Sequence, residues 1–489
     1  MNRGYRLYSA FMVLLLVIPT KAQNFEEIYF SFRQQAKEEY RNFRNQCNEE
    51  YADFMEKAWR QFKGMPPKES PLKDNPVVPP MPYEEEDTIE DNKLPDVDVL
   101  PVIPPEPQPK PIEPIKEQPQ PVEESFTFYF YGTKGSVRLS KDLQFTVNGI
   151  SEAYIADAWR FFSAEESLDN VIRDCLELRI RHGLCDWAYF QMLQQLGKQF
   201  YGKDCNEAVL LTAYLYCQSG YKMRLAHDTE RLYILLASKH AIYDYGYFVV
   251  GDESFYLLQE HTGDALYICE ASFPNEQGLS LWMEKAPSLN VVRSESRTLQ
   301  SKRYPELKAE VYTNLNLLSY FDGYPSSEIA GNKMTCWAMY AMTPISNEVK
   351  ASLYPRLESK LQGLSEADAA NRLLNFVQTA FEYEYDEVVW GGERALFAEE
   401  SLHYPYCDCE DRSILYSHLV RDLLGLKVAL VYYPGHLATA VCFNEEVQGD
   451  YLSIDNHRFI ICDPTYINAP IGANMPGLEC DKIEVIVLE

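Results

Sequence analysis

The sequence is short of two things, positive charge and long apolar runs. It has 45 Lys and Arg against 73 Asp and Glu among 489 residues, which gives a formal net charge of −28 at pH 7. This acidity argues against nucleic acid and anionic membrane surfaces as partners, because both repel a negatively charged protein. No stretch approaches the 18 or so uninterrupted apolar residues of a membrane span. The length instead favours two or three domains with sizeable cores.

The first 22 residues have the pattern of a secretory signal peptide. Arg3 and Arg6 precede an apolar run over residues 11–18, and residues 20–22 offer a cleavage site. No cysteine closely follows the run to take a lipid anchor. We therefore expect an exported protein, periplasmic or secreted. Its twelve cysteines have irregular spacings, which do not predict a small disulfide scaffold.

Residues 23–64 predict one long amphipathic helix. Aromatic and small apolar residues recur at every third or fourth position from Phe25 to Phe62. Such a stripe has to be covered by a second copy of the chain, by a partner, or by the body of the same protein. Self-association or docking on the body is the expected outcome.

Residues 65–124 predict an extended, semi-rigid linker. Seventeen of the 29 prolines lie between Pro66 and Pro121, among charged residues and almost without glycine. Proline segments of this kind can dock in an aromatic groove, but a spacer is the simpler interpretation. The folded body is then expected to begin near Phe126.

Two α+β domains are expected after the linker, over residues 125–290 and 345–489, joined by a connecting region over 291–344. The first is predicted to begin with a β-hairpin formed by residues 126–131 and 143–147, followed by a helical stretch over 153–196.

The two predicted domains share a pattern. Residues 220–223 align with 425–428, 239–241 with 435–437, and 255–259 with 459–463. The alignment sets Cys205 against Cys409, His240 against His436 and Gln259 against Asp463. We interpret residues 125–290 as a diverged copy of the later domain. Gln259 can accept a hydrogen bond from an imidazole but cannot neutralise an imidazolium, so the copy is expected to serve structure or binding. Whether Cys205 and His240 form a second site stays open.

Three residues of the later domain predict a catalytic site. Cys409, His436 and Asp463 follow one another at two equal steps of 27 residues. Cys409 directly precedes a helical pattern that ends at Gly425. His436 follows a Pro-Gly turn and leads an apolar strand, and Asp463 closes the next apolar strand before a proline. A thiol at a helix start, with an imidazole and a carboxylate on the sheet beside it, is the pattern of a cysteine nucleophile, its base and its orienter.

This segment resembles the catalytic core of the transglutaminase-like superfamily. The resemblance is carried by Asp408-Cys409-Glu410-Asp411, Gly435-His436 and Cys462-Asp463-Pro464-Thr465. It implies a papain-like fold, a helix packed on an antiparallel sheet, with Cys409 as nucleophile, His436 as base and Asp463 as orienter. Cys407 departs from the family pattern, which has a small residue at that place.

The predicted start of the helix at Cys409 affects how readily its thiol loses a proton. Its backbone N–H groups and dipole favour a thiolate at Cys409, whereas Glu410 and Asp411 oppose it by like-charge repulsion. These effects are each of order 1 kcal/mol and roughly cancel, so His436 has to activate the sulfur. The backbone N–H of Cys409 is one expected oxyanion donor, and Trp390 and Tyr406 are candidates for the second.

Two other interpretations of the cysteine stay open. Cys409 can be a core residue or half of a disulfide, with His436 and Asp463 structural. A zinc site formed by His403, Cys407, Cys409 and His418 is disfavoured, because Cys-x-Cys followed by a helical histidine matches no usual structural-zinc spacing. No metal and no cofactor are expected.

The expected function is that of an exported cysteine peptidase or amidase acting on peptides, proteins or peptide-bearing wall polymers through a thioacyl enzyme. With a lysine amine instead of water as acceptor, the same residues would perform transglutaminase cross-linking. The alternative from another class is a catalytically silent binding or scaffold protein.

Overall fold

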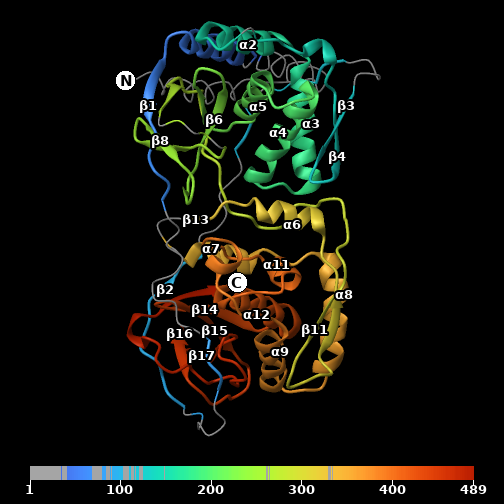
Figure 1. The fold of residues 1–489 in the computed structure, drawn as a ribbon, viewed down its shortest axis with the longest axis vertical. Helices are drawn as coiled ribbons and strands as arrows, with labels where there is room; N and C mark the ends of the chain where they lie inside the picture. Colours follow the sequence, from blue (N-terminus) through green and yellow to red (C-terminus); the bar gives the residue numbers. More distant parts are fainter. Residues whose placement is uncertain are drawn as a thin grey trace, which may run out of the picture.

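A computed structural model gives the fold of the chain (Figure 1). It describes residues 35, 41–68, 80–83, 89, 91–102, 109–111, 115, 117–119, 125–147, 149–259, 261, 263, 265–328, 332 and 334–488. The predicted signal peptide lies outside these residues. The described chain is a mixture of helices and mainly antiparallel sheets, so the expected α+β class is confirmed. None of its described helices is long and apolar enough to cross a membrane.

Two lobes each contain a six-stranded sheet (Figure 1). The first sheet has the order β1-β10-β5-β6-β9-β8, from β1 (Trp59–Lys63), β5 (Met223–His227), β6 (Leu232–Ala237), β8 (Tyr247–Val250), β9 (Glu253–Tyr256) and β10 (Ala265–Cys269). The second has the order β2-β18-β14-β15-β17-β16, from β2 (Val99–Leu100), β14 (Lys427–Tyr433), β15 (His436–Cys442), β16 (Tyr451–Ile454), β17 (His457–Cys462) and β18 (Glu484–Leu488).

The two sheets have the same topology. In each lobe one helix leads into five strands that follow the same spatial order, and a strand from the N-terminal part of the chain completes the edge. The leading helices are α5 (Asn206–Gln218) and α12 (Cys409–Leu424). Helix α5 therefore occupies in the first lobe the place that α12 occupies in the second.

The predicted alignment of His240 with His436 is wrong. His436 begins β15 and pairs with Tyr433 across the turn from β14. The residue at the matching place is Arg231, which accepts the backbone N–H of Asp228 over 3.1 Å across a turn of the same length. His240 lies beyond the other end of β6. The alignment failed because it matched a segment that follows β6 with the residues that begin β15.

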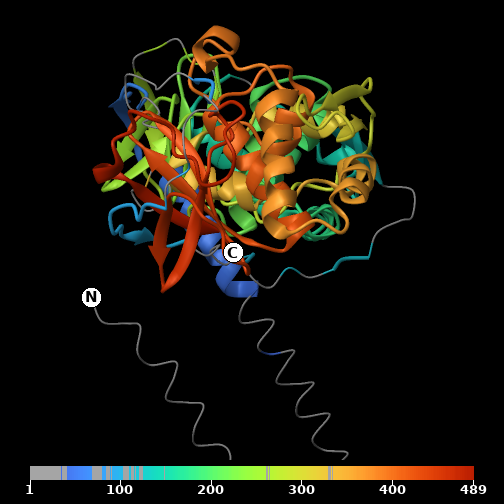
Figure 2. The same cartoon turned by 90° about the horizontal axis from the view of Figure 1, so that it is seen from below.

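Helices cover each sheet. The first lobe has α2 (Glu152–Ala164), α3 (Leu168–His182) and α4 (Asp186–Tyr201) besides α5. The second has α7 (Met334–Met342), α8 (Asn347–Leu361), α9 (Glu366–Ala380), α10 (Asp386–Val389) and α11 (Ala398–His403) besides α12. Figure 2 shows the strands of the second sheet on one side of the lower lobe and its helices on the other. Serine side chains cap α2, α8 and α9 by accepting a hydrogen bond from a backbone N–H of the first turn.

Smaller elements join the lobes. They are the hairpin of β11 (Arg297–Gln300) and β12 (Lys308–Val311), α6 (Leu315–Asp322), and β7 (Ala241–Ile242) paired with β13 (Ser327–Glu328), together with two 3-10 turns, Lys141–Leu143 and Cys480–Lys482. The predicted connecting region 291–344 thus includes α7, which packs against α12 and β18 of the second lobe.

The predicted hairpin has a different second strand. Strand β3 (Phe126–Phe130) pairs with β4 (Thr133–Val137), and Tyr131 and Gly132 form the turn with positive φ angles of 43° and 65°. The sequence pattern did not predict a strand at Gly135, because glycine is uncommon inside strands. A Cβ there would lie 2.6 Å from the ring of Phe128, so glycine is what allows this ring to cross the partner strand.

The predicted single helix from Phe25 to Phe62 is wrong at its C-terminal end. Residues 41–55 are helical, but Trp59–Lys63 form strand β1. The helix docks on the first lobe through Tyr51 and Met55, which are buried, and through an ion pair of 2.7 Å between Arg44 and Asp169. Of the two expected outcomes, docking on the body is the one observed.

The described residues from 59 to 102, here called the N-terminal arm, are part of both lobes rather than a spacer. In the first lobe β1 pairs with β10 at one edge of the sheet, and Met65 bonds to Tyr247 of β8 at the other edge. In the second, β2 pairs with β18, and Leu94 bonds to Tyr451 of β16. The arm thus closes both sheets into barrels, and the prediction that the folded body begins near Phe126 is wrong.

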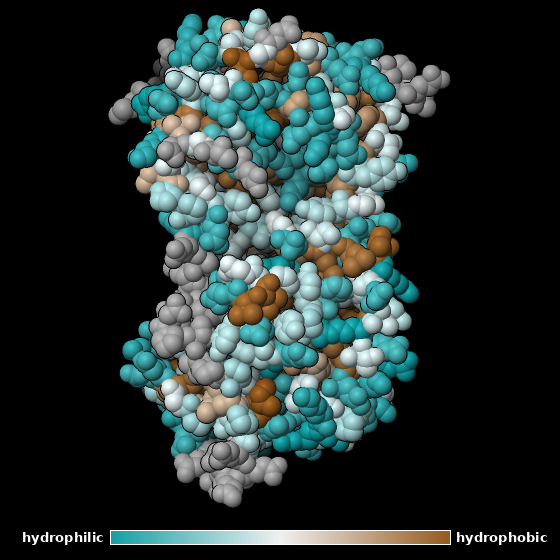
Figure 3. Space-filling model, viewed as in Figure 1, coloured by the Kyte–Doolittle hydropathy of each residue, from teal (hydrophilic) through white to brown (hydrophobic). Residues whose placement is uncertain are grey.

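The barrel interiors are apolar and contain arm residues. Phe62 packs into the first barrel and Leu94 is buried in the second. The face of the molecule in Figure 3 is mainly hydrophilic with scattered apolar residues, in keeping with the acidic composition.

Candidate active site

Helix α12 begins at the predicted nucleophile. Asp408 is its N-cap, and the backbone N–H of Asp408 donates to the side chain of Asp411 over 3.3 Å in a reciprocal capping box. Cys409 is the first helical residue and is 1 % exposed. The local sequence therefore fixes the sulfur at the positive end of a 16-residue helix.

His436 and Asp463 are in direct contact. His436 Nε2 lies 2.9 Å from Asp463 Oδ2, and the two residues are 0 % and 1 % exposed. Strands β15 and β17 are antiparallel neighbours, which brings the start of one next to the end of the other. Asp463 Oδ1 accepts the backbone N–H groups of Thr465 and Tyr466 over 2.8 and 3.2 Å. The carboxylate is therefore held in one orientation toward the imidazole.

The helix that begins at Cys409 packs against the strand that begins at His436. Ser413, one turn further along α12, donates its hydroxyl to the backbone carbonyl of Leu437 over 2.9 Å, and Leu437 follows His436. His436 Nδ1 is buried and has no hydrogen-bond partner in the described part of the chain, so the Cys409 thiol is not hydrogen-bonded to it. The structure thus brings His436 and Asp463 into contact and holds the first turns of α12 against the start of β15.

Two residues that the sequence did not single out hold this end together. Gln378 of α9 donates to the carbonyl oxygens of Asp463, Tyr466 and Ala469 over 2.8–3.1 Å. Arg412, 1 % exposed, donates to the carbonyl oxygens of Gln378, Phe381 and Pro464 over 3.2–3.5 Å. These side chains lock the loop that carries Asp463. Neither lies in a motif, so the sequence alone gave no signal for them.

A cluster of buried acids surrounds the sulfur. The Cys409 thiol donates to Glu410 Oε2 over 3.2 Å. Ligand atoms of Asp386, Glu393, Asp408, Cys409, Glu410 and Asp411 form three overlapping groups, and within each group they lie within 4.8 Å of one another. Carboxylate oxygens at such distances are ligands that hard cations accept. Carboxylate charges this close also disfavour a negative charge on the Cys409 sulfur. A thiolate there therefore has a greater need of an imidazolium at His436.

Helix α7 packs against the helix that begins at Cys409. Burial raises the pKa of Cys336 to about 11, and the charge of Glu410 adds to the rise, so α7 lies near the acid that contacts the sulfur. The ring of Trp337 lies 5.4 Å from that of Tyr432, whose hydroxyl accepts the backbone N–H of Gly435 over 3.3 Å. The indole N–H of Trp337 is buried without an acceptor among the described residues.

The other oxyanion candidates have different contacts. The ring of Trp390 stacks under Arg394 at 4.6 Å and against Tyr404 at 4.8 Å. Tyr406 is 37 % exposed. These contacts fit packing roles for both residues.

The alternative interpretations of Cys409 can be compared with the geometry. All twelve cysteines are free thiols, so Cys409 is not half of a disulfide. Burial raises the pKa of Cys407 to about 12. His403 bonds to Thr313, and His418 bonds to the carbonyl oxygen of Tyr340. Among the described residues, no group of metal-ligating atoms contains Cys407, His403 or His418, which argues against the zinc set.

The matching place in the first lobe has different chemistry. Cys205 is the N-cap of α5, and Gln259 lines the same cavity. Arg231, which pairs with Asp228 across the turn, stands where the second lobe has His436. His240 bonds instead to Ser280 over 3.1 Å, and burial lowers its pKa to about 4. The structure therefore does not bring His240 to this place as a base.

Comparison with known proteins adds no family. No protein-family model matches the chain, and no curated protein matches it.

Proposed function

We propose that the second lobe is a transglutaminase-like cysteine hydrolase, a peptidase or amidase, of an exported protein. The observation that carries the proposal is the buried contact of 2.9 Å between His436 and Asp463, next to the helix start that bears Cys409. The proposed export rests on the signal-peptide pattern of residues 1–22.

The contacts assign the proton positions. Asp463 accepts from Nε2 of His436, so Nδ1 is the nitrogen that exchanges a proton with the thiol. In the first half-reaction the Cys409 sulfur bonds to the carbonyl carbon of an amide. The carbon–nitrogen bond then breaks, and the leaving amine takes the proton from Nδ1. In the second half-reaction water attacks the thioester, His436 accepts its proton, and the acid and the free thiol are released.

The charge that develops on the carbonyl oxygen needs two donors. The backbone N–H of Cys409 at the start of α12 is one. For the second, Trp337 replaces Trp390 and Tyr406 as the best candidate, because its indole N–H is buried and without an acceptor among the described residues.

The site is closed in this structure. Cys409, His436 and Asp463 are at most 1 % exposed, and α7 packs against α12, the helix that begins at Cys409. A substrate therefore reaches the sulfur only after α7 or a neighbouring loop moves, which is the usual behaviour of sites that exclude water during acyl transfer.

Water is the proposed acceptor because it is the default acceptor of a thioester and because hydrolysis lies within the range of the family that the segment resembles. The same thioester passed to an amine would make the protein a cross-linking transglutaminase. A catalytically silent scaffold is the alternative from another class.

The experiment is a comparison of the wild-type chain with Cys409→Ala on a peptide library read by mass spectrometry. We expect cleavage or deamidation by the wild type and a loss of at least about a thousandfold in the variant. Cys407→Ala is the matched control and should keep its turnover. Added lysine ethyl ester distinguishes the acceptors, because a transglutaminase would convert it into an isopeptide product. Unchanged turnover in Cys409→Ala would remove the nucleophile from the proposal.

A further inference from the structure

The first lobe has cavities where the second lobe has its candidate active site. Three adjoining cavities of about 420, 180 and 640 Å³ all share Gln259 as a lining residue. The largest lies at the start of α5 and is lined by Cys205. Because α5 corresponds to α12, this groove is at the place equivalent to Cys409, but it is open.

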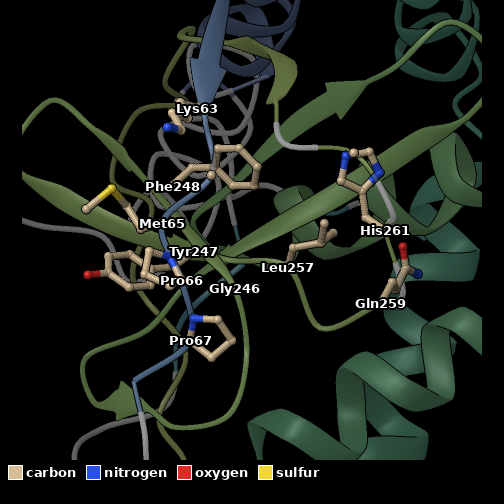
Figure 4. Close-up of a pocket in the computed structure, with 12 residues that line it drawn as sticks. Lys63, Met65, Pro66, Pro67, Gly246, Tyr247, Phe248, Leu257, Gln259 and His261 are labelled. Carbon is tan, nitrogen blue, oxygen red and sulfur yellow. The ribbon is translucent and has the colours of Figure 1, made fainter.

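A buried histidine points to a ligand in this groove. His261 lines the 420 Å³ cavity, and its side chain is 9 % exposed. The Tyr233 hydroxyl donates to Asp228 over 2.8 Å, so it accepts from His261 Nδ1, 3.3 Å away. Nε2 is then a free acceptor, buried and without a partner in the described part of the chain. Figure 4 shows His261 and Gln259 together on one side of the cavity, across Leu257 from Met65, Tyr247 and the two prolines.

The lining is suited to an uncharged chain rather than to an ion. Over the three cavities the cations Lys63, Lys198, Lys203 and Arg231 nearly offset the acids Asp204, Glu207 and Glu230. The glutamines that line the cavities, Gln194, Gln195 and Gln259, each offer both a donor and an acceptor, which is the pattern that pairs with an amide group. The three cavities meet at Gln259, and their combined volumes suit several residues of peptide.

We propose that the first lobe binds an extended, uncharged stretch of polypeptide in this groove without cleaving it. Gln259 pairs with a ligand amide, and His261 Nε2 accepts a ligand N–H. The peptide is of the same chemical class as the substrate proposed for the second lobe, and only this choice of ligand rests on the proposed function.

The groove binds the peptide without cleaving it, because it lacks a catalytic base for Cys205. Arg231 occupies the position of the base, and its guanidinium cannot take up a proton, so no imidazole at that position activates Cys205. Burial also raises the pKa of the Cys205 thiol, and the neighbouring Glu207 adds to the rise. Cys205 is a convenient reporter instead, because it is half-buried in the wall of the largest cavity.

The test uses the full chain carrying Cys409→Ala, so that no probe is consumed. The probe is the fluorescein-labelled peptide Gly-Ala-Gln-Ala-Gln-Ala-Gly with an amidated C-terminus, and its binding is followed by fluorescence anisotropy. Adding Gln259→Leu or His261→Phe should raise the dissociation constant at least fivefold. Gln46→Leu, an exposed glutamine of the N-terminal helix, is the matched control and should leave it unchanged.

A second measurement does not depend on how these variants fold. Saturating unlabelled probe should slow the alkylation of Cys205 by iodoacetamide at least threefold, as read by mass spectrometry. Binding that is insensitive to both substitutions and leaves Cys205 unprotected would overturn the proposal, and so would the absence of binding. Tighter binding of a probe with glutamate in place of glutamine would assign the groove to anions and overturn the amide proposal. Because the readout is binding to a chain without the nucleophile, a failure of the catalytic proposal gives a different result, namely intact binding with no turnover in the wild type.

Discussion

The sulfur of Cys409 and a carboxylate oxygen of Glu410 lie 3.2 Å apart in a site with almost no exposure to water. A negative charge at this distance disfavours a thiolate strongly, because Coulomb interactions of unit charges at about 4 Å reach several kcal/mol in a partly buried site. The imidazolium form of His436 therefore has to outweigh Glu410.

Replacing Glu410 by Gln should make Cys409 more reactive. The amide keeps the shape but removes the charge, so we expect the rate of Cys409 alkylation by iodoacetamide at pH 7 to rise about tenfold or more. Mass spectrometry of the labelled peptide measures the rate. Glu358→Gln, an exposed acid on α8, is the control and should have no effect. A slower reaction in Glu410→Gln would show that Glu410 takes the proton from the sulfur and is its base.

At the scale of elements, the carboxyl group of one residue links helix α11 to helix α8 by a hydrogen bond. Glu399 of α11 is 2 % exposed and accepts the backbone N–H of Ser346, the N-cap of α8. Burial raises its pKa from the ordinary 4.5 to about 7. Below about pH 4.5 the carboxyl is neutral in both the folded and the unfolded chain. Between that pH and 7 the unfolded chain releases the proton and the folded chain keeps it, so the stability of the folded state falls as the pH rises.

Glu399→Gln should remove this pH dependence. Gln still accepts the N–H of Ser346 but does not ionise, so the variant should gain stability relative to the wild type from pH 4.5 to pH 8, by at most about 3 kcal/mol. Thermal unfolding followed by circular dichroism at pH 5 and pH 8 measures the difference. The exposed Glu358→Gln should show no such trend. Melting temperatures that keep a constant offset between variant and wild type would contradict the assignment.

Two elements show why local patterns failed. The periodicity of Phe25 to Phe62 is helical, yet residues 59–63 pair with β10, because an edge of the first sheet is available there. Likewise Thr133–Val137 becomes a strand despite Gly135, because Phe128 on β3 needs the space. In both cases a partner distant in sequence decided the conformation.

At the scale of the whole molecule, the N-terminal arm is the common component of the two lobes. It closes both barrels and places Phe62 and Leu94 on their apolar interiors. In each lobe an arm strand thus pairs with a strand more than a hundred positions later in the chain. The arm lies in the region where proline content alone predicted a spacer.

A chain that begins at residue 125 should be unstable. It lacks β1, β2 and the docked helix, and the loss of each buried large apolar side chain costs about 2–5 kcal/mol. We expect aggregation on expression or a melting temperature at least about 10 °C below that of the full chain. Removal of residues 1–22 alone is the control and should not lower it. A truncated chain that melts with the full one would show that the barrels close without the arm.

The sequence by itself determined the local chemistry of the site: a helix that starts at Cys409, a strand led by His436 and a strand closed by Asp463, because caps, turns and alternation act over a few residues. The α+β class followed from the same signals. Only the tertiary structure decided that Arg231 stands where a second base was predicted, that Gln378 and Arg412 lock the loop of Asp463, and that the proline-rich arm completes both barrels. These contacts join residues far apart in the chain, and their formation depends on sheet edges and cavities that exist only once the chain has folded.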